Sequence, residues 1–160
     1  MRRSSGFSLI ELLIVISIIG ILAAVAIPQL QRYLKTGKET AAIQTLQNIH
    51  KAEATFYSTR GKYGNLDQLV ADDLLNKNYG EGKTISGYTY TSTEVANNSF
   101  TVHADRAEAS TAYRDFNITE KGDVYYVENK EAKGTVARGQ GLLLSESEAA
   151  DSKATPADKK

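Results

Sequence analysis

The stretch that decides the fold covers residues 6–28 and reads GFSLIELLIVISIIGILAAVAIP, an apolar run with one charged side chain, Glu11. Residues 7–27 would span ~30 Å as a helix, which is the thickness of the hydrocarbon core of a bilayer. Arg2 and Arg3 precede the run, and basic residues favour the cytoplasmic side of a membrane. The segment therefore predicts a helix that enters a membrane, with the rest of the chain on the exported side.

Glu11 is the one side chain in this run that a membrane strongly disfavours. A carboxylate at the bilayer centre costs ~2.5–3.5 kcal/mol on insertion scales. One explanation is an interfacial position, because Glu11 lies only ~6 Å along the helix axis from Phe7, near the positive end of the helix dipole. A second explanation is cleavage between Gly6 and Phe7, which would create a positively charged α-amine on Phe7. The amine of one copy could then pair with Glu11 of its neighbour at low dielectric and set the axial register of the packed helices.

The hexapeptide GFSLIE at residues 6–11, followed by the apolar run that ends at Ile27 and Pro28, resembles the N-terminus of type IV prepilins. The resemblance implies cleavage after Gly6 and N-methylation of Phe7 by a prepilin peptidase. It also implies a structural role: the precursor sits in the inner membrane, and the pilus assembly machinery polymerises the mature chain into an extracellular filament. The chain would contact other copies of itself through its N-terminal helix, with Phe7 and Glu11 at the contact. The family includes major pilins, minor pilins and the pseudopilins of type II secretion.

Two other interpretations of the same region remain open. Many pilins close a C-terminal loop with a disulfide, and this chain has no cysteine, which leaves a pseudopilin of a type II secretion system as an alternative. Ala24-Val25-Ala26 has the small-x-small pattern that ordinary signal peptidase cuts, and that cut would release a soluble periplasmic domain beginning at Ile27. Glu11 inside the hydrophobic run and Pro28 just after such a cut both weigh against this second alternative.

Two residues weaken the helix near the end of the apolar run. Pro28 has no N–H and removes the donor for the carbonyl of Ala24, and Gly20 costs about 1 kcal/mol relative to Ala. We expect the stretch from Gly20 to Pro28 to bend or to lose helicity and, as in the filaments that the sequence resembles, to allow extension.

Beyond this point the helical period continues over residues 29–60 as an amphipathic helix. Its apolar stripe predicts the face that carries the rest of the chain. The stripe consists of Leu30, Leu34, Ile43, Leu46, Ile49 and Phe56.

Residues 61–144 predict a head. Residues 66–75 indicate a short second helix, and from Tyr88 onward the period changes to two, with turn-like stretches at residues 97–98 and 120–123. This pattern predicts three or four antiparallel strands joined by hairpins, and residues 142–144 could add a last strand or helical turn. One face of the sheet should cover the helix stripe and the other should be solvated. The predicted fold class is α+β, a long N-terminal helix with a small antiparallel sheet packed on its distal half, which is the pilin fold.

The expected organisation has five parts. They are a leader peptide at residues 1–6, a transmembrane and filament-core helix at 7–28, an amphipathic helix at 29–60, the head at 61–144 and a tail at 145–160. The tail is polar and poor in aromatics, which predicts disorder.

Composition gives no support for catalysis or nucleic-acid binding. Nineteen Lys and Arg balance nineteen Asp and Glu, so there is no basic excess that would indicate a nucleic-acid partner. His103 and Asp105 share one face of a predicted strand with Thr101, which we interpret as a solvated face and not as a catalytic pair. Carboxylates at residues 72, 73, 120 and 123 fit a surface cluster better than a calcium site. We therefore expect no enzymatic activity, no cofactor and no bound metal.

Overall fold

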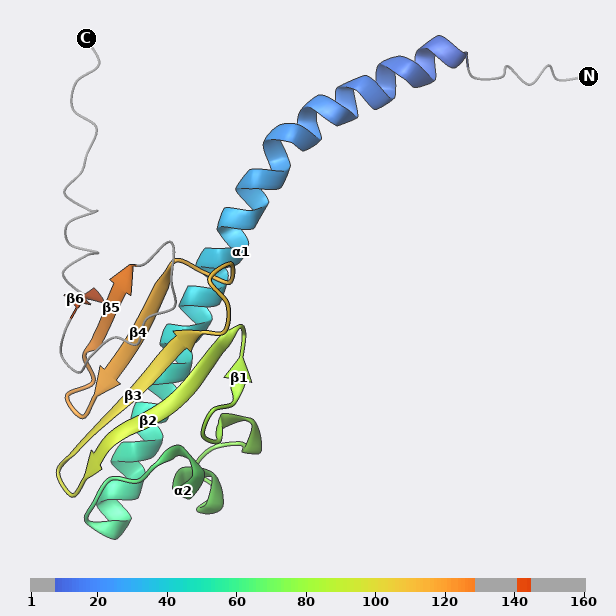
Figure 1. Ribbon diagram of the computed structural model, residues 1–160. Coiled ribbons are helices and arrows are strands. Elements are labelled where there is room, and N and C mark those ends of the chain that lie inside the picture. The colour runs from blue at the N-terminus through green and yellow to red at the C-terminus, as the bar shows by residue number, and fades with distance from the viewer. Residues whose placement is uncertain (1–7, 129–140, 145–160) are drawn as a thin grey trace, which may run out of the picture. The chain divides into compact units, whose positions relative to one another are not determined.

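The computed structural model describes residues 8–128 and 141–144. The chain forms two compact units, residues 1–36 and residues 37–160. One long helix, α1 (Leu9–Arg60), contributes its first part to the first unit and its second part to the second (Figure 1). The predicted leader at residues 1–6, Phe7 and the predicted tail at residues 145–160 lie outside the described residues.

The predicted long helix is confirmed, and its C-terminal end has a local cause. α1 runs without interruption through Gly20 and Pro28. The hydroxyl of Ser17 donates to the carbonyl of Leu13 at 2.7 Å, so this polar group is satisfied within the helix itself. α1 ends where Gly61 adopts a φ of +69° and donates its N–H to the carbonyl of Tyr57 at 2.8 Å, because glycine accepts this left-handed conformation without strain.

Within the second unit, one face of α1 is buried. The buried residues recur at intervals of three and four and are Glu39, Ala42, Thr45, Leu46, Ile49, Ala52, Glu53 and Phe56. The predicted stripe is confirmed at Leu46, Ile49 and Phe56 but is wrong at Leu30 and Leu34, whose exposed fractions are 57% and 58%. Those two residues continue the exposed apolar surface of the first unit.

The second helix, α2 (Leu66–Ala71), is shorter than predicted. Its start is a capping box, in which the side chain of Asn65 accepts the N–H of Gln68 at 2.9 Å and the side chain of Gln68 accepts the N–H of Asn65 at 3.0 Å. The helix stops before residue 75 because Asp73 has a φ of +57°, which is incompatible with a right-handed helix. A 3₁₀ turn, η1 (Lys77–Tyr79), then leads towards the sheet.

Within its described residues, the second unit contains a six-stranded antiparallel sheet whose strands are neighbours in chain order (Figure 1). The strands are β1 (Thr84–Ile85), β2 (Tyr88–Ala96), β3 (Ser99–Arg106), β4 (Arg114–Thr119), β5 (Val124–Glu128) and β6 (Leu142–Leu143). The prediction of three or four strands accounts for β2 to β5, and β6 falls where the sequence allows a last strand. The sequence pattern does not predict β1, because two residues cannot show a period of two. The turn predicted at residues 97–98 joins β2 to β3, and the turn predicted at residues 120–123 joins β4 to β5.

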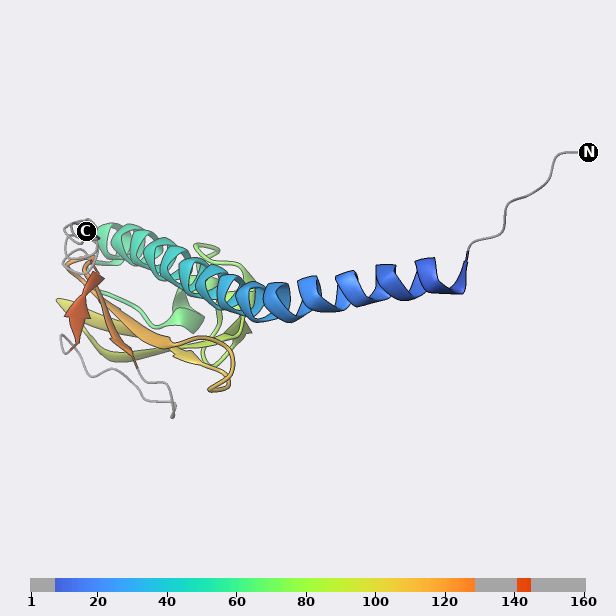
Figure 2. The ribbon, with the colours of Figure 1, turned by 90° about the horizontal axis from the view of Figure 1, so that it is seen from above.

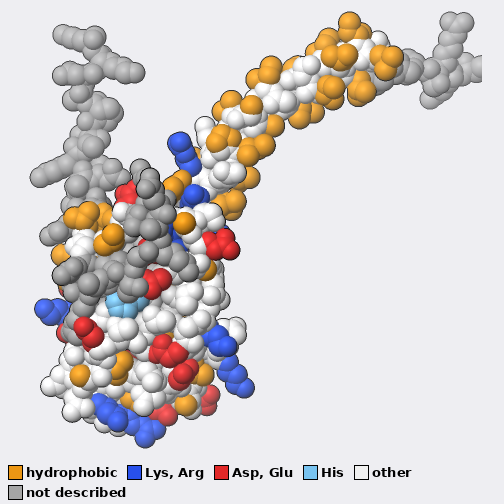
Figure 3. Space-filling view, viewed as in Figure 1, with side chains coloured by type: hydrophobic (Ala, Val, Ile, Leu, Met, Phe, Trp, Pro, Cys, Tyr) orange, Lys and Arg blue, Asp and Glu red, His pale blue; other side chains and the backbone are white. Residues whose placement is uncertain are grey.

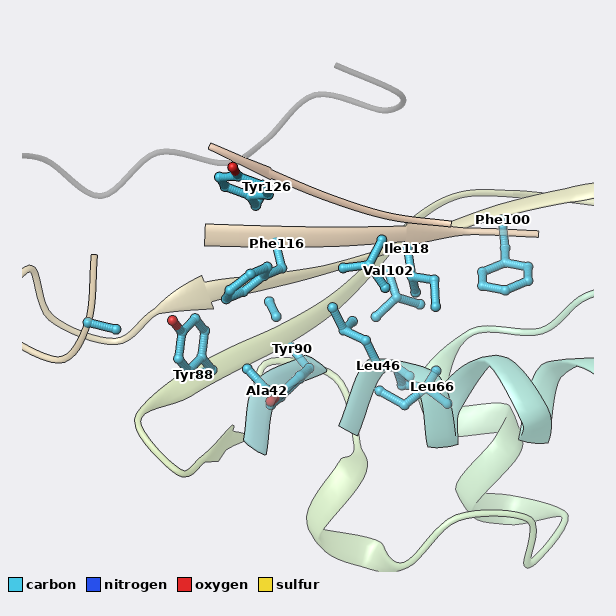
Figure 4. Packing of buried hydrophobic residues seen from close by; sticks show 14 residues of the cluster. Ala42, Leu46, Leu66, Tyr88, Tyr90, Phe100, Val102, Phe116, Ile118 and Tyr126 are labelled. Carbon is cyan, nitrogen blue, oxygen red and sulfur yellow. The ribbon is translucent and has the colours of Figure 1, made fainter. Parts of the chain in front are cut away.

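The hydrophobic core lies between the sheet and the two helices. α1 covers one face of the sheet (Figure 2), and Figure 4 shows Leu46 of α1 and Leu66 of α2 pointing towards Val102 and Ile118 of the sheet. All four of these side chains are buried. The architecture is therefore the predicted α+β arrangement of a long helix and an antiparallel sheet.

The prediction of a solvated outer face is wrong for the two central strands. Thr101 and His103 on β3, and Asn117 and Thr119 on β4, lie on the face opposite the core residues and are nevertheless buried. Both strands have partners on either side, so neighbouring side chains can shield this face, and the hydroxyl of Thr93 lies 2.7 Å from Nε2 of His103.

Candidate functional site

The first unit presents an apolar surface along α1. The large hydrophobic side chains of residues 9–34 have exposed fractions from 44% to 85%, and Figure 3 shows hydrophobic side chains along this stretch of the helix. They are Leu9, Ile10, Leu12, Leu13, Ile14, Val15, Ile16, Ile18, Ile19, Ile21, Leu22, Val25, Ile27, Leu30, Tyr33 and Leu34. By length and composition, α1 can cross a membrane. Since burying one such side chain is worth ~1.5–3 kcal/mol, removing the whole surface from water would release a few tens of kcal/mol.

Glu11 lies in the first turn of α1 and is exposed. Its neighbours Ile10 and Leu12 are 68% and 54% exposed, so the carboxylate interrupts a continuous apolar surface. Among the described residues it makes no ion pair. A cost of ~2.5–3.5 kcal/mol for one carboxylate is small beside the gain from the surrounding side chains, so the segment can be buried with Glu11 in it. The predicted cleavage site at Gly6 and the predicted partner, the amine of Phe7, lie outside the described residues, and the pairing stays a prediction.

Gly20 and Pro28 are both exposed on α1. A Cβ added to Gly20 would meet no atom within 4 Å, so packing within this chain does not require a glycine there. The helix is unbroken across both residues, and the loss of helicity predicted for the stretch between them stays a prediction.

Two carboxylates of α1 hold other parts of the second unit to this helix. One holds the sheet and the other holds the loop that follows α1. The sequence analysis did not single out either of them. The first, Glu39, is 3% exposed and pairs with Arg114 of β4, whose NH2 lies 2.8 Å from Oε2. It also accepts the backbone N–H groups of Tyr113 at 2.8 Å and Arg114 at 3.2 Å. The guanidinium of Arg114 in turn lies 5.0 Å from the ring centroid of Tyr126. This cluster therefore ties the start of β4 to α1 with charge-assisted hydrogen bonds.

The second carboxylate, Glu53, is fully buried. It accepts the N–H of Gly64 at 3.1 Å, which holds the loop after α1 against the helix. Burial raises the pKa of Glu53 from 4.5 to about 7, although the hydrogen bond from Gly64 acts in the opposite direction. A signal for both residues was present in the sequence, because Glu39 and Glu53 fall at helical spacing within the apolar stripe.

Comparison with known proteins finds a known motif within the first unit. The family model of the prokaryotic N-terminal methylation motif matches residues 1–27, which contain the whole of the predicted cleavage site, Glu11 and the apolar run. This segment therefore carries the prokaryotic N-terminal methylation motif.

Curated pilins and fimbrial proteins are similar to part of this chain. The type IV major pilin protein PilA of Myxococcus xanthus is 43% identical over 61 residues, which are 38% of this chain and 28% of that protein. A fimbrial protein of Pseudomonas aeruginosa is 48% identical over 52 residues, 32% of this chain and 34% of that protein. A fimbrial protein of Moraxella nonliquefaciens is 34% identical over 83 residues, 51% of this chain and 54% of that protein. The chain thus spans between about a quarter and a half of the length of these relatives.

The second unit contains a further buried ion pair, which is structural by its position. Arg106 and Asp115 are both fully buried, and NH2 of Arg106 lies 2.9 Å from Oδ2 of Asp115. The same guanidinium donates from Nε to Oδ1 at 3.0 Å and from NH1 to the carbonyl of Ala112 at 3.1 Å. These bonds close the connection between β3 and β4, since Arg106 ends one strand and Asp115 lies near the start of the next.

The candidate catalytic and metal residues have structural partners. His103 is buried beside Thr93, and Asp72 accepts hydrogen bonds from Arg60 at the surface. In residues 8–128 and 141–144, no group of three or more His, Asp or Glu side chains could hold a metal ion. The main features of the described part of the second unit are hydrophobic packing and ion pairs.

Proposed function

We propose that this chain is a structural subunit of a type IV pilus. In this proposal a prepilin peptidase removes residues 1–6 by cutting between Gly6 and Phe7 and methylates the new N-terminus. The precursor spans the inner membrane with residues 7–28, and the assembly machinery transfers the mature subunit into an extracellular filament. The subunit acts by self-association and needs neither a cofactor nor a catalytic residue of its own.

The observation that carries the proposal is the exposed apolar surface of residues 9–34 with Glu11 in its first turn. A surface of this size must be covered by lipid or by protein. In the membrane, lipid covers it. In a filament, the same surface of neighbouring copies covers it, and the amine of Phe7 neutralises Glu11 of the next subunit, so that charge pairing fixes the axial register. The stretch from Gly20 to Pro28 would supply flexibility within the filament.

The relatives support the same proposal, because they are major pilins and fimbrial proteins. No described feature favours a pseudopilin or a soluble periplasmic domain over a pilus subunit. We place the precursor in the inner membrane and the mature subunit in an extracellular pilus on these grounds.

The test is the mature N-terminus of the protein isolated from its own host, determined by mass spectrometry, together with electron microscopy of filaments sheared from the cells. The expected result is N-methylated Phe7 on subunits in the filament fraction. A terminus at Ile27 on a diffusible protein would overturn the proposal, because the apolar surface and Glu11 would have been discarded. Loss of secreted enzymes on deletion, without loss of filaments, would favour the pseudopilin instead.

A further inference from the structure

The apolar surface of α1 ends in a short group of residues with a different chemistry. From Leu12 to Gln31 no side chain is charged, and the next four residues are Arg32, Tyr33, Leu34 and Lys35. Arg32 is exposed and Tyr33 is 72% exposed, whereas Lys35 is partly buried. Arg32 and Lys35 are three residues apart, so they are neighbours on the helix surface. We call Arg32, Tyr33 and Lys35 the headgroup belt.

The depth of these residues matches the polar layer of a bilayer. The apolar run ends at Ile27, and each helical residue adds 1.5 Å, so the backbone of Arg32 lies about 7–8 Å beyond that end and the backbone of Lys35 about 12 Å. The headgroup layer on each side of the hydrocarbon core is roughly 5–7 Å thick. Arginine and lysine side chains extend back towards the interface, and tyrosine is enriched at this depth. The cations and the phenol can therefore lie at the level of the lipid phosphates.

The sign of the charges makes this position informative. The proposed orientation keeps Arg2 and Arg3 in the cytoplasm, and the belt then lies on the exported side, where basic residues close to a spanning helix oppose that orientation. Arg32 and Lys35 equal the N-terminal arginine pair in number. Anions at the same depth on the exported side would offset this cost, and the phosphate groups of lipids lie at that depth.

We propose that the headgroup belt binds the phosphates of anionic phospholipids in the exported leaflet of the membrane that holds the precursor. This inference rests on the proposed membrane-inserted precursor. Arg32 and Lys35 supply the positive charge, Tyr33 inserts its ring beside the acyl chains with its hydroxyl at the polar layer, and the belt fixes the depth of α1. The contact must break when the subunit leaves the membrane. Anionic lipid therefore retains the subunit in the membrane and opposes its extraction.

The test uses the full chain in vesicles of phosphatidylcholine alone or of phosphatidylcholine mixed with phosphatidylglycerol. Because the chain has no cysteine, single cysteines can be introduced for spin labels at Leu22, inside the apolar run, and at Gln31, beside the belt. Lipid preference is read by mass spectrometry of the lipids that remain with the protein after mild detergent extraction. The variant is Arg32→Gln/Lys35→Gln, and the matched control is Lys51→Gln/Lys62→Gln, which removes two exposed cations from the second unit.

The original chain should retain phosphatidylglycerol over phosphatidylcholine. In the belt variant the ratio of the two retained lipids should fall at least tenfold, since each cation near an anionic surface contributes roughly fivefold to binding. The control should change it by less than twofold. The Gln31 label should also lie closer to the polar layer in the anionic vesicles, and the shift should disappear in the belt variant.

Three results would overturn the inference in distinguishable ways. If the Leu22 label is shielded from water-soluble relaxing reagents but no lipid preference depends on the belt, the membrane-inserted precursor stands and the belt does not bind lipid. If the belt variant instead changes crosslinking between copies in neutral vesicles, the cations bind a second copy of the chain. If the Leu22 label is accessible to water in both lipids, the precursor is not inserted and both proposals fail.

Discussion

Glu53 is fully buried in α1, and burial raises its pKa from 4.5 to about 7. The folded state therefore binds a proton on this carboxyl more tightly than the unfolded state does. The contribution of Glu53 to stability is complete below pH 4.5, falls as the pH rises towards 7, and does not change further above that value. The difference corresponds to about 3 kcal/mol, at 1.36 kcal/mol for each pKa unit.

We predict that Glu53→Gln stabilises the protein at pH 8 by about 2–3 kcal/mol and leaves it unchanged at pH 4. The amide resembles the protonated acid and still accepts the N–H of Gly64, but it never ionises. Denaturant unfolding of the full chain in detergent between pH 4 and pH 8 measures the effect. Glu108→Gln, at an exposed position, is the control. The same pH dependence in Glu53→Gln as in the original chain would contradict the assignment.

The ion pair of Glu39 and Arg114 should matter more than the pair of Arg60 and Asp72. Glu39 and Arg114 have side-chain exposures of 3% and 28%, against 57% and 29% for Arg60 and Asp72. We predict that Glu39→Gln lowers the free energy of unfolding by about 2–3 kcal/mol, because it leaves a partly buried guanidinium without its counter-charge. Asp72→Asn should lower it by less than ~1 kcal/mol, as expected of exposed pairs. Equal losses in urea titrations of the two variants would show that burial is not the deciding factor.

At the scale of the elements, the turn between β4 and β5 is held to α1 by a close approach. Gly122 has a φ of +82°, and a Cβ built on it would lie 3.2 Å from Cε1 of His50. Nε2 of His50 lies 3.1 Å from the carbonyl of Glu120 in the same turn. The glycine is therefore required both by the backbone conformation and by the imidazole beneath it.

We predict that Gly122→Ala destabilises the head by ~1–3 kcal/mol. In a His50→Ala background only the backbone part, ~1–2 kcal/mol, should remain, because the clash is gone. Unfolding of the two single variants and the double variant gives the coupling between the residues. A coupling of zero would mean that the turn relaxes away from His50 without cost.

The elements with strong periodicity were predictable from the sequence, and those fixed by single contacts were not. α1 and the strands β2 to β5 follow from runs of apolar residues at periods of 3.6 and two. The end of α2 depends on the φ of Asp73, and β1 has two residues, so neither leaves a periodic signal. The predicted stripe includes Leu30 and Leu34 because an apolar pattern on a helix does not show where the sheet that packs against it begins.

The same limit applies to the candidate site. The apolar run and Glu11 were visible at once, because a charge in such a run is unusual. Glu39 and Glu53 fall at helical spacing within the apolar stripe, but a carboxylate on a helix is ordinarily solvated, so this spacing alone does not predict that they are buried. His103 was misjudged for the converse reason, since alternation separates the two faces of a sheet but does not say whether the second face is covered.

At the scale of the whole molecule, assembly should depend on Glu11 more than membrane insertion does. We predict that Glu11→Gln reduces filament recovery at least tenfold while the precursor still reaches the membrane, because removing the charge lowers the cost of insertion and abolishes the pairing with Phe7. Immunoblots of membrane and sheared fractions, with electron microscopy, separate the two steps. Glu108→Gln should assemble normally. Abundant filaments from Glu11→Gln would show that the apolar surface alone sets the register.

The sheet of the head joins each strand to its neighbour in the chain, from β1 through β6. Sheets of this kind have a low contact order, and low contact order is associated with fast folding. In the proposed orientation the chain emerges from the membrane with α1 first and β6 last. Each hairpin can then close as soon as its second strand has been exported, without waiting for the C-terminus. Export and folding of the head can thus proceed together and in the same direction along the chain.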